Sequence, residues 1–252
     1  MKIWADFHTH TRYSHGTGTI EQNVRAAMKR GLCAIGISEH GPANIGLCLK
    51  LEDFHKMREE IERLRNKYTD IDILLGCEAN IVSLDGELDI PDYILEDLDY
   101  SMVGLHPMVW PRSLKDGFCL FFENIIAKVV DSGPLKEKVM EQNTTALIKA
   151  ISNNNIKIVT HPGLHLPIDT AKLARAAVEN RTALEINAGH GYMTEEYVKI
   201  AKANGAKFAI GSDAHHPRDV GNLKKALEIV QKAGLSERDI INADLTCETV
   251  RC

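Results

Sequence analysis

Histidine and acidic residues in this chain stand just after strand-like apolar runs, where side chains with metal-binding chemistry can converge. Histidine accounts for 11 of the 252 residues. His8 and His10 are spaced two apart, as are Asp213 and His215. In extended backbone, residues i and i+2 point to the same side, so each pair can contact one centre. Imidazole and carboxylate groups at this spacing indicate a metal site.

The candidate metal ligands are seven histidines, one glutamate and one aspartate that follow different predicted strands: His8, His10, His15, His40, Glu78, His106, His161, Asp213 and His215. One zinc ion usually takes about four ligands. The set is therefore large enough for two or three ions, with Glu78 placed to bridge two of them. Imidazole suits zinc, iron and manganese. Because the set contains no cysteine, a Cys-rich structural zinc site is disfavoured.

Such a cluster predicts hydrolysis by a metal-activated hydroxide. A bound metal lowers the pKa of water from about 15.7 towards about 7, and cations neutralise charge that develops on phosphoryl oxygens. We expect Glu78 and Asp213 to be catalytic, with His190 or His216 as the proton donor to the leaving group. The sequence has no G-x-S-x-G and no P-loop motif, so a covalent mechanism has little support.

Other residues near the predicted ligands are candidates for supporting roles. Arg12 and Arg218 stand in ligand-bearing loops, and a guanidinium can bind phosphate through two hydrogen bonds. They are our candidates for binding the substrate phosphate, and an ordinary surface arginine is the alternative for each. Asp6 and Glu39 are either turn residues or groups that orient a ligand histidine. The sixth predicted strand lacks a strong ligand at its end and offers Glu185 and Asn187 instead.

Short runs rich in Val, Ile and Leu alternate with longer amphipathic stretches along the chain. The predicted strands cover 2–7, 33–38, 72–78, 100–105, 156–160, 183–187 and 206–211. The first predicted helix begins at Thr19, which forms a capping box with Gln22, and stops before Gly31. Further helices are predicted over 52–68, 118–131, 135–153, 169–179, 194–204 and 219–233. This alternation predicts parallel strands in a β/α barrel or a doubly wound open sheet.

Length and composition are those of one globular domain over residues 1–252, with 44% hydrophobic and 26% charged residues. The irregular stretches 41–50, 80–99 and 107–117 each follow a strand end, and loops on one face of a barrel commonly build the active site. The 30 basic and 35 acidic residues give a net charge of −5. This balance offers no basic surface for a long polyanion, so we do not expect nucleic-acid binding.

The sequence gives no sign of a membrane segment, because no run of about 18 apolar residues occurs. The N-terminus does not resemble a signal peptide. The six cysteines include no CxxC pair, and Cys33 and Cys77 stand in apolar runs where a reduced thiol behaves as a small hydrophobe. We therefore expect a reduced, cytoplasmic protein.

The motifs resemble those of the PHP family (polymerase and histidinol phosphatase), in particular its small YcdX-like phosphatases. The matching segments run in the family order between residues 6 and 215: His8-Thr9-His10, Ser38-Glu39-His40, Glu78, His106-Pro107, His161-Pro162 and Asp213-Ala214-His215. The resemblance implies an α/β fold, a distorted seven-stranded, TIM-like (β/α)7 barrel. It also implies up to three divalent metal ions, with zinc as the leading candidate and iron or manganese as alternatives.

The resemblance also divides the ligands into three sets: His8, His10, Glu78 and Asp213 for one metal; Glu78, His106 and His161 for a second; and His15, His40 and His215 for a third. The loop between His10 and His15 is slightly shorter than in the family pattern.

The resemblance favours hydrolysis of small-molecule phosphomonoesters, with a small phosphorylated metabolite as substrate and histidinol phosphate as the family's named substrate. A PHP-type nuclease or phosphodiesterase that acts on nucleic-acid ends or oligonucleotides is an alternative. The same cluster could serve another hydrolysis, such as amide or cyclic-ester opening, because a fold does not fix a function. A non-enzymatic metal-binding module is a further alternative. The oligomeric state is left open, a homo-oligomer included.

Overall fold

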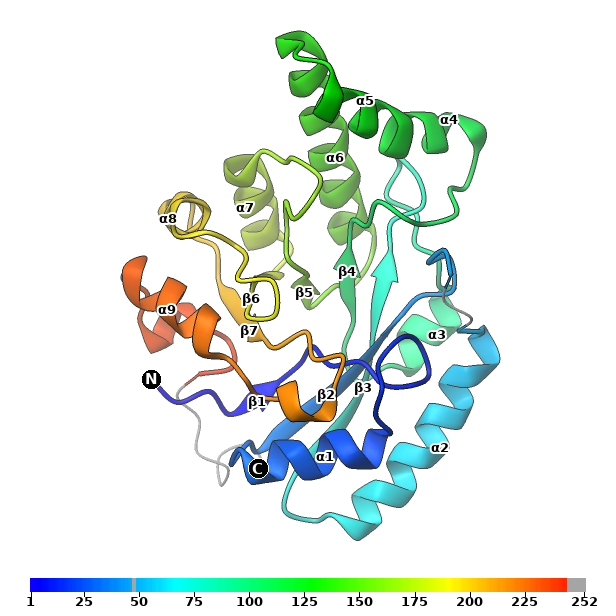
Figure 1. The fold of residues 1–252 in the computed structure, drawn as a ribbon, viewed down its shortest axis with the longest axis vertical. Helices are drawn as coiled ribbons and strands as arrows, with labels where there is room; N and C mark the ends of the chain where they lie inside the picture. The colour runs from blue at the N-terminus through cyan, green and yellow to red at the C-terminus, as the bar shows by residue number, and fades with distance from the viewer. Residues whose placement is uncertain (47–48, 244–252) are drawn as a thin grey trace.

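The computed structural model describes residues 1–46 and 49–243. Its sheet contains seven parallel strands: β1 (Ala5–Asp6), β2 (Ala34–His40), β3 (Asp72–Asn80), β4 (Met102–Gly104), β5 (Ile158–Val159), β6 (Ala183–Asn187) and β7 (Phe208–Gly211). Each strand pairs with the next one along the chain, from β1 with β2 to β6 with β7. All seven predicted strands are present, and their parallel arrangement is confirmed (Figure 1).

The two edges of the sheet meet just beyond β1 and β7. The backbone N–H of His10 donates to the carbonyl of Ala214 at 2.8 Å, and the N–H of Ala214 donates to the carbonyl of His8 at 3.3 Å. Thr9 and Ala214 form an isolated parallel bridge at the same place. These contacts make the sheet a nearly closed barrel. The structure is therefore the distorted (β/α)7 barrel and not the doubly wound open sheet.

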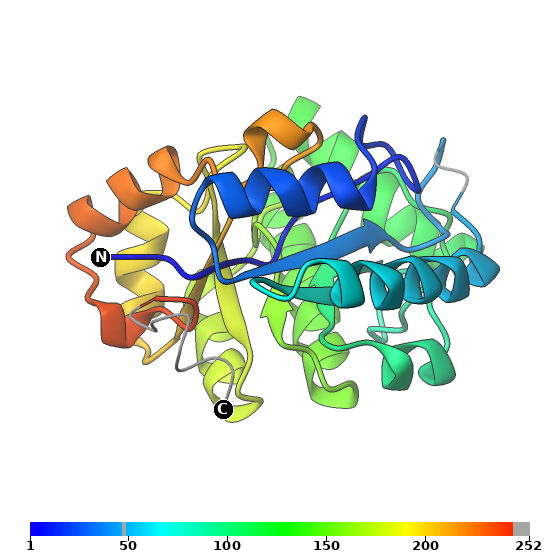
Figure 2. The same cartoon turned by 90° about the horizontal axis from the view of Figure 1, so that it is seen from below.

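Helices connect the strands and cover the outside of the barrel. They are α1 (Ile20–Lys29), α2 (Leu51–Lys67), α3 (Asp92–Asp97), α4 (Leu114–Gly117), α5 (Glu123–Val129), α6 (Gly133–Asn153), α7 (Thr170–Glu179), α8 (Glu195–Ala203) and α9 (Lys224–Lys232). A π-helical turn η1 (Phe118–Phe122) joins α4 to α5, and η2 (Pro217–Asp219) and η3 (Glu237–Asp239) are 3-10 turns. Figure 2 shows β2 between α1 and α2, whose apolar faces pack on β2 and β3. Helices α6 to α9 pack on the side of β4 to β7.

The predicted helices agree with the structure except at α3, at α4, at the start of the helix predicted over 118–131, where residues 118–122 form η1, and at the start of the helix predicted over 219–233. The capping box is confirmed: the Thr19 hydroxyl accepts from the Gln22 N–H at 3.1 Å, and the Gln22 side chain accepts from the Thr19 N–H at 2.9 Å. The short helices α3 and α4 lie in stretches predicted to be irregular, because neither is long enough to show a helical period. The helix predicted over 219–233 begins only at Lys224, after η2.

Tyr100 fills the barrel interior from the end opposite to the predicted ligands. Its hydroxyl donates to the carbonyl of Phe7 at 2.5 Å. A Cβ atom at Gly36 would lie 2.0 Å from the Tyr100 oxygen, and one at Gly76 would lie 2.3 Å from the Tyr100 ring. Glycine at these two strand positions therefore leaves the space that the tyrosine ring occupies.

Within the described ranges, none of the helices has the length and apolar character needed to cross a membrane. Cys77 and Cys119 are buried free thiols. Cys33 is disulfide-bonded, so the expectation of a reduced thiol at this position is wrong.

Candidate metal centre

The nine predicted ligands converge at the carboxyl ends of the strands. Each comes from a strand end or from the loop that follows it: His8, His10 and His15 after β1, His40 on β2, Glu78 on β3, His106 after β4, His161 after β5, and Asp213 and His215 after β7. His8, His10 and Glu78 are completely buried, and His15 is exposed. In a parallel barrel these ends meet on one face, which is why residues far apart in sequence lie together.

Glu78 stands at the middle of this cluster, and its two carboxylate oxygens face different histidines. Oε1 lies 3.2 Å from His106 Nε2 and 3.0 Å from His161 Nε2. Oε2 lies 3.3 Å from His8 Nε2 and 3.1 Å from His40 Nδ1. A carboxylate between two groups of imidazole nitrogens has the arrangement of a ligand that bridges two cations.

Asp213 approaches the same centre from the far side of the barrel. Its Oδ1 lies 3.5 Å from His8 Nε2 and 3.4 Å from His10 Nε2, and these two imidazole nitrogens are 3.1 Å apart. Asp213 has φ 54°, and His161 has φ 27°. Residues other than glycine seldom adopt positive φ, and such strained positions cluster at functional sites.

The remaining histidines form the outer edge of the cluster. The Nε2 atoms of His15 and His215 are in contact, and the rings of His15 and His40 are stacked with centroids 4.8 Å apart. Three groups of residues each bring ligand atoms within 4.8 Å of one another: His10, His40 and His215; His8, His10 and Glu78; and His40, Glu78 and His106. His40 therefore lies between the ligand set that contains His215 and the one that contains Glu78.

Several buried ligand atoms in this cluster have no hydrogen-bond partner. They are Oε2 of Glu78, Nδ1 of His40 and Nε2 of His106. Glu78 Oε2 and His40 Nδ1 lie only 3.1 Å apart without a hydrogen bond between them. An unpaired polar atom in a protein interior is costly. Divalent cations among these atoms would satisfy them, so the residues present fit a metal centre.

Burial and charge prepare these side chains for metal binding. Burial holds the pKa of His40 well below its usual value, which outweighs the opposing attraction of Glu78. His40 is therefore neutral at pH 7, the state in which imidazole binds a metal. Although burial acts in the opposite direction, the positive charge of His8 holds the pKa of Glu78 well below its usual value. Glu78 is accordingly an ionised carboxylate.

Asp6 and Glu39 support the loops that carry the ligands. Asp6 accepts hydrogen bonds from the backbone N–H groups of Ser212 at 3.0 Å and Gly221 at 2.9 Å, and so ties the end of β1 to the segment after β7. Glu39 accepts a hydrogen bond from the N–H of Thr11 at 2.7 Å and further bonds from two hydroxyl groups of the same loop. Burial raises the pKa of Glu39 to about 7.

Comparison with known proteins shows the family of this chain. The family model described as PHP domain matches residues 6–235. The chain belongs to the PHP domain family. It is 34% identical to a probable phosphatase of Thermoanaerobacter sp. strain X514 over 97% of this chain and 92% of the relative, and 31% identical to a probable phosphatase of Clostridium acetobutylicum over the same shares.

A solved structure gives a matching fold at lower sequence identity. Histidinol phosphate phosphatase from Lactococcus lactis, complexed with zinc, L-histidinol and phosphate, superposes with a TM-score of 0.63. The match is 18% identical and covers 92% of this chain and 94% of that one. At this identity the likeness shows the fold of the PHP domain alone.

An open cavity of this PHP domain adjoins the metal-ligand cluster, and Lys225 from α9 is among the residues that line it. His15, His190, Asp213 and His215 also line it. The Lys225 ammonium donates to the carbonyl of Gly189 at 3.0 Å. Lysine has three N–H donors, so two remain for a bound anion. Lys225 was missed in the sequence because it belongs to a helix and not to a strand end.

Neither of the predicted phosphate-binding arginines, Arg12 and Arg218, lines this cavity. Arg218 lines a neighbouring groove together with Arg25, Arg30 and His216, and its guanidinium lies 3.7 Å from the carboxylate of Asp219. Arg12 is exposed in the loop before His15. His190 does reach the cluster, because its Nε2 lies 3.3 Å from Asp213 Oδ2.

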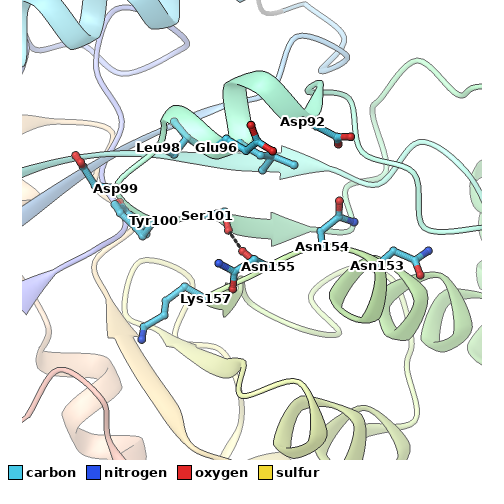
Figure 3. A pocket seen from close by; sticks show the side chains of 11 residues that line it. Asp92, Glu96, Leu98, Asp99, Tyr100, Ser101, Asn153, Asn154, Asn155 and Lys157 are labelled. Carbon is cyan, nitrogen blue, oxygen red and sulfur yellow. Dashed lines mark hydrogen bonds between the residues drawn. The ribbon is translucent and has the colours of Figure 1, made fainter.

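A separate pocket at the amino ends of β4 and β5 has none of these features. Figure 3 shows it between Asp92 and Glu96 of α3, Ser101 before β4, and Asn155 and Lys157 before β5. None of the nine predicted ligands lines it. The metal-ligand cluster therefore lies outside this pocket, at the carboxyl ends of the strands.

Proposed function

We propose that this PHP domain is a metal-dependent phosphatase that hydrolyses small-molecule phosphomonoesters. The observation that carries the proposal is Glu78, whose two carboxylate oxygens face separate sets of histidines. The curated relatives, which are described as probable phosphatases, support the reaction class. The zinc, L-histidinol and phosphate in the Lactococcus lactis structure support zinc and a small phosphorylated metabolite.

We assign the metals, three in number, to the ligand sets that the family resemblance implied. One set is His8, His10, Glu78 and Asp213; the second is Glu78, His106 and His161; the third is His15, His40 and His215. The close approaches of Glu78 and Asp213 to His8 favour the first set, and those of Glu78 to His106 and His161 favour the second. When bound, these cations would supply a hydroxide nucleophile and neutralise charge on the phosphoryl oxygens.

The chain's own side chains would bind the substrate and move the proton. Lys225 is placed in the cavity to bind a phosphoryl oxygen with its free N–H donors. His190 lines the same cavity, and 46% of its side chain is exposed, so a leaving group can reach it. His190 would donate the proton that the leaving oxygen needs. Arg12 and Arg218 remain alternative phosphate ligands.

One experiment tests the proposal directly. The purified protein, with its metals quantified, is assayed for phosphate release from a panel of phosphomonoesters that includes histidinol phosphate. A 5′-phosphorylated oligonucleotide is assayed in parallel. We expect release from at least one small ester, loss of this activity on chelation, and no trimming of the oligonucleotide. Trimming without release from small esters would favour the nuclease. A metal-loaded protein inactive on every substrate would contradict the proposal.

A further inference from the structure

Glu185 of β6 is a buried carboxylate that contacts predicted metal ligands but is not itself one of them. Its exposed fraction is 1%. Oε1 lies 2.7 Å from Nδ1 of His8, and Oε2 accepts hydrogen bonds from the backbone N–H of His161 at 2.9 Å and from the Asn187 side chain at 3.1 Å. Both oxygens of Glu185 are thus bonded to protein groups, so this carboxylate is not placed to be a metal ligand.

The contact with His8 has a consequence for that imidazole. An ionised carboxylate only accepts hydrogen bonds, so Nδ1 of His8 must carry a proton. In the neutral ring Nε2 then has the free lone pair. Nε2 is the atom that lies 3.1 Å from His10 Nε2 and 3.3 Å from Glu78 Oε2. We infer that Glu185 is a positioning residue that fixes the orientation and the tautomer of His8 for metal binding, an inference that rests on the proposed metal centre.

The same carboxylate also reaches ligands of other strands. The backbone of His161, which Glu185 holds, has the rare φ of 27°. The side chain of Asn187 donates to Asp213 Oδ2 at 3.0 Å as well as to Glu185. One residue of β6 therefore connects ligands that follow β1, β5 and β7.

The barrel leaves space for this arrangement at Gly211 of β7. A Cβ atom at Gly211 would lie 2.2 Å from Glu185 Oε1 and 2.8 Å from the Cβ of His8. Any side chain there would displace the carboxylate from the imidazole. Gly211→Ala therefore keeps the charge of Glu185 and disturbs its contact with His8.

The test compares zinc affinity, measured by competition with a chromogenic chelator, in the wild type and in Glu185→Gln, Gly211→Ala and Glu123→Gln. Glu123 is the matched control because it is another buried carboxylate, on α5, that binds Lys138. Loss of an outer partner of a metal-bound histidine typically weakens metal binding by about 10- to 100-fold. We expect losses of this size in Glu185→Gln and Gly211→Ala, and wild-type affinity in Glu123→Gln. Folded Glu185→Gln with wild-type affinity would overturn the inference.

A second measurement uses the wild type alone and so does not depend on a variant that folds. In ¹⁵N-labelled, zinc-loaded protein, the ring nitrogens of His8 are identified by their loss in His8→Gln. We expect a protonated Nδ1 and a zinc-bound Nε2, and the reverse would overturn the inference. A wild type that binds no zinc would instead remove the proposed metal centre itself, so the two failures are distinguishable.

Discussion

The acidic residues of this site have separate tasks that follow from their partners. Glu78 has one buried oxygen without any hydrogen bond and faces five nitrogen atoms of different histidines, whereas Asp6 and Glu39 have their oxygens occupied by backbone and hydroxyl donors. A carboxylate with unpaired oxygen atoms can bind a cation. A carboxylate whose oxygens are already bonded can only hold other groups in place. The hydrogen bonds of each carboxylate therefore distinguish the predicted metal ligand Glu78 from Asp6 and Glu39, which hold neighbouring groups in place.

The first prediction concerns Glu78. Replacing it by glutamine keeps the volume of the side chain but removes the negative charge between the two groups of imidazoles. We expect less bound metal per chain and a value of kcat/KM for a phosphomonoester lower by more than about 100-fold, because even an outer partner contributes about 10- to 100-fold. Metal analysis and steady-state kinetics measure both. Glu123→Gln is the control, and an active, fully metallated Glu78→Gln enzyme would contradict the bridging role.

The second prediction concerns Lys225. Replacing it by alanine removes a charged hydrogen bond, which is worth about 1.5–3 kcal/mol, so we expect KM for the substrate to rise by roughly 10- to 100-fold. Metal content should not change. Lys224→Ala is the matched control, because Lys224 is exposed and lines a different groove. If Arg12→Ala or Arg218→Ala raises KM and Lys225→Ala does not, the phosphate is bound by the arginine predicted from sequence.

At the scale of the elements, the strands could be predicted from sequence because apolar runs and the residues that end them carry a local signal. The spacing of two residues identified His8 with His10 and Asp213 with His215. The same spacing joins Glu185 to Asn187, but only the folded structure shows that both bind ligand residues. Lys225 carries no such signal, since it reaches the cavity through the packing of α9. The helices α3 and α4 are too short to show a period.

The third prediction concerns the packing of Tyr100 against Gly36 of β2. Gly36→Ala places a methyl group 2.0 Å from the Tyr100 oxygen, and overpacking of this kind typically costs about 1–3 kcal/mol. We expect the free energy of unfolding in urea to fall by that amount with metal present. Gly133→Ala is the control, because no atom lies within 4 Å of its added Cβ. Equal stability of the two variants would show that Tyr100 can move without cost.

At the scale of the whole molecule, the barrel is completed where its ligands lie. Its first and last strands meet through backbone bonds of His8, His10 and Ala214, next to Asp213. The neighbouring side chains of His10, His40, Glu78 and His106 leave buried polar atoms without partners. Closure of the fold and binding of metal therefore depend on one region, so that the stability of the barrel and the occupancy of the site are linked.

The fourth prediction follows from this linkage. A ligand that binds only the folded state stabilises it by about 2.7 kcal/mol at a concentration 100 times its Kd. For a chain of this size about 1 kcal/mol changes Tm by roughly 2–4 °C, so we expect chelation to lower Tm by roughly 5–11 °C and zinc to restore it. The control is Glu78→Gln, whose Tm should respond much less to chelation because its site holds less metal. An unchanged wild-type Tm, with metal loss verified by analysis, would show that the barrel closes without the cations, and the unpaired atoms around Glu78 would then need another partner.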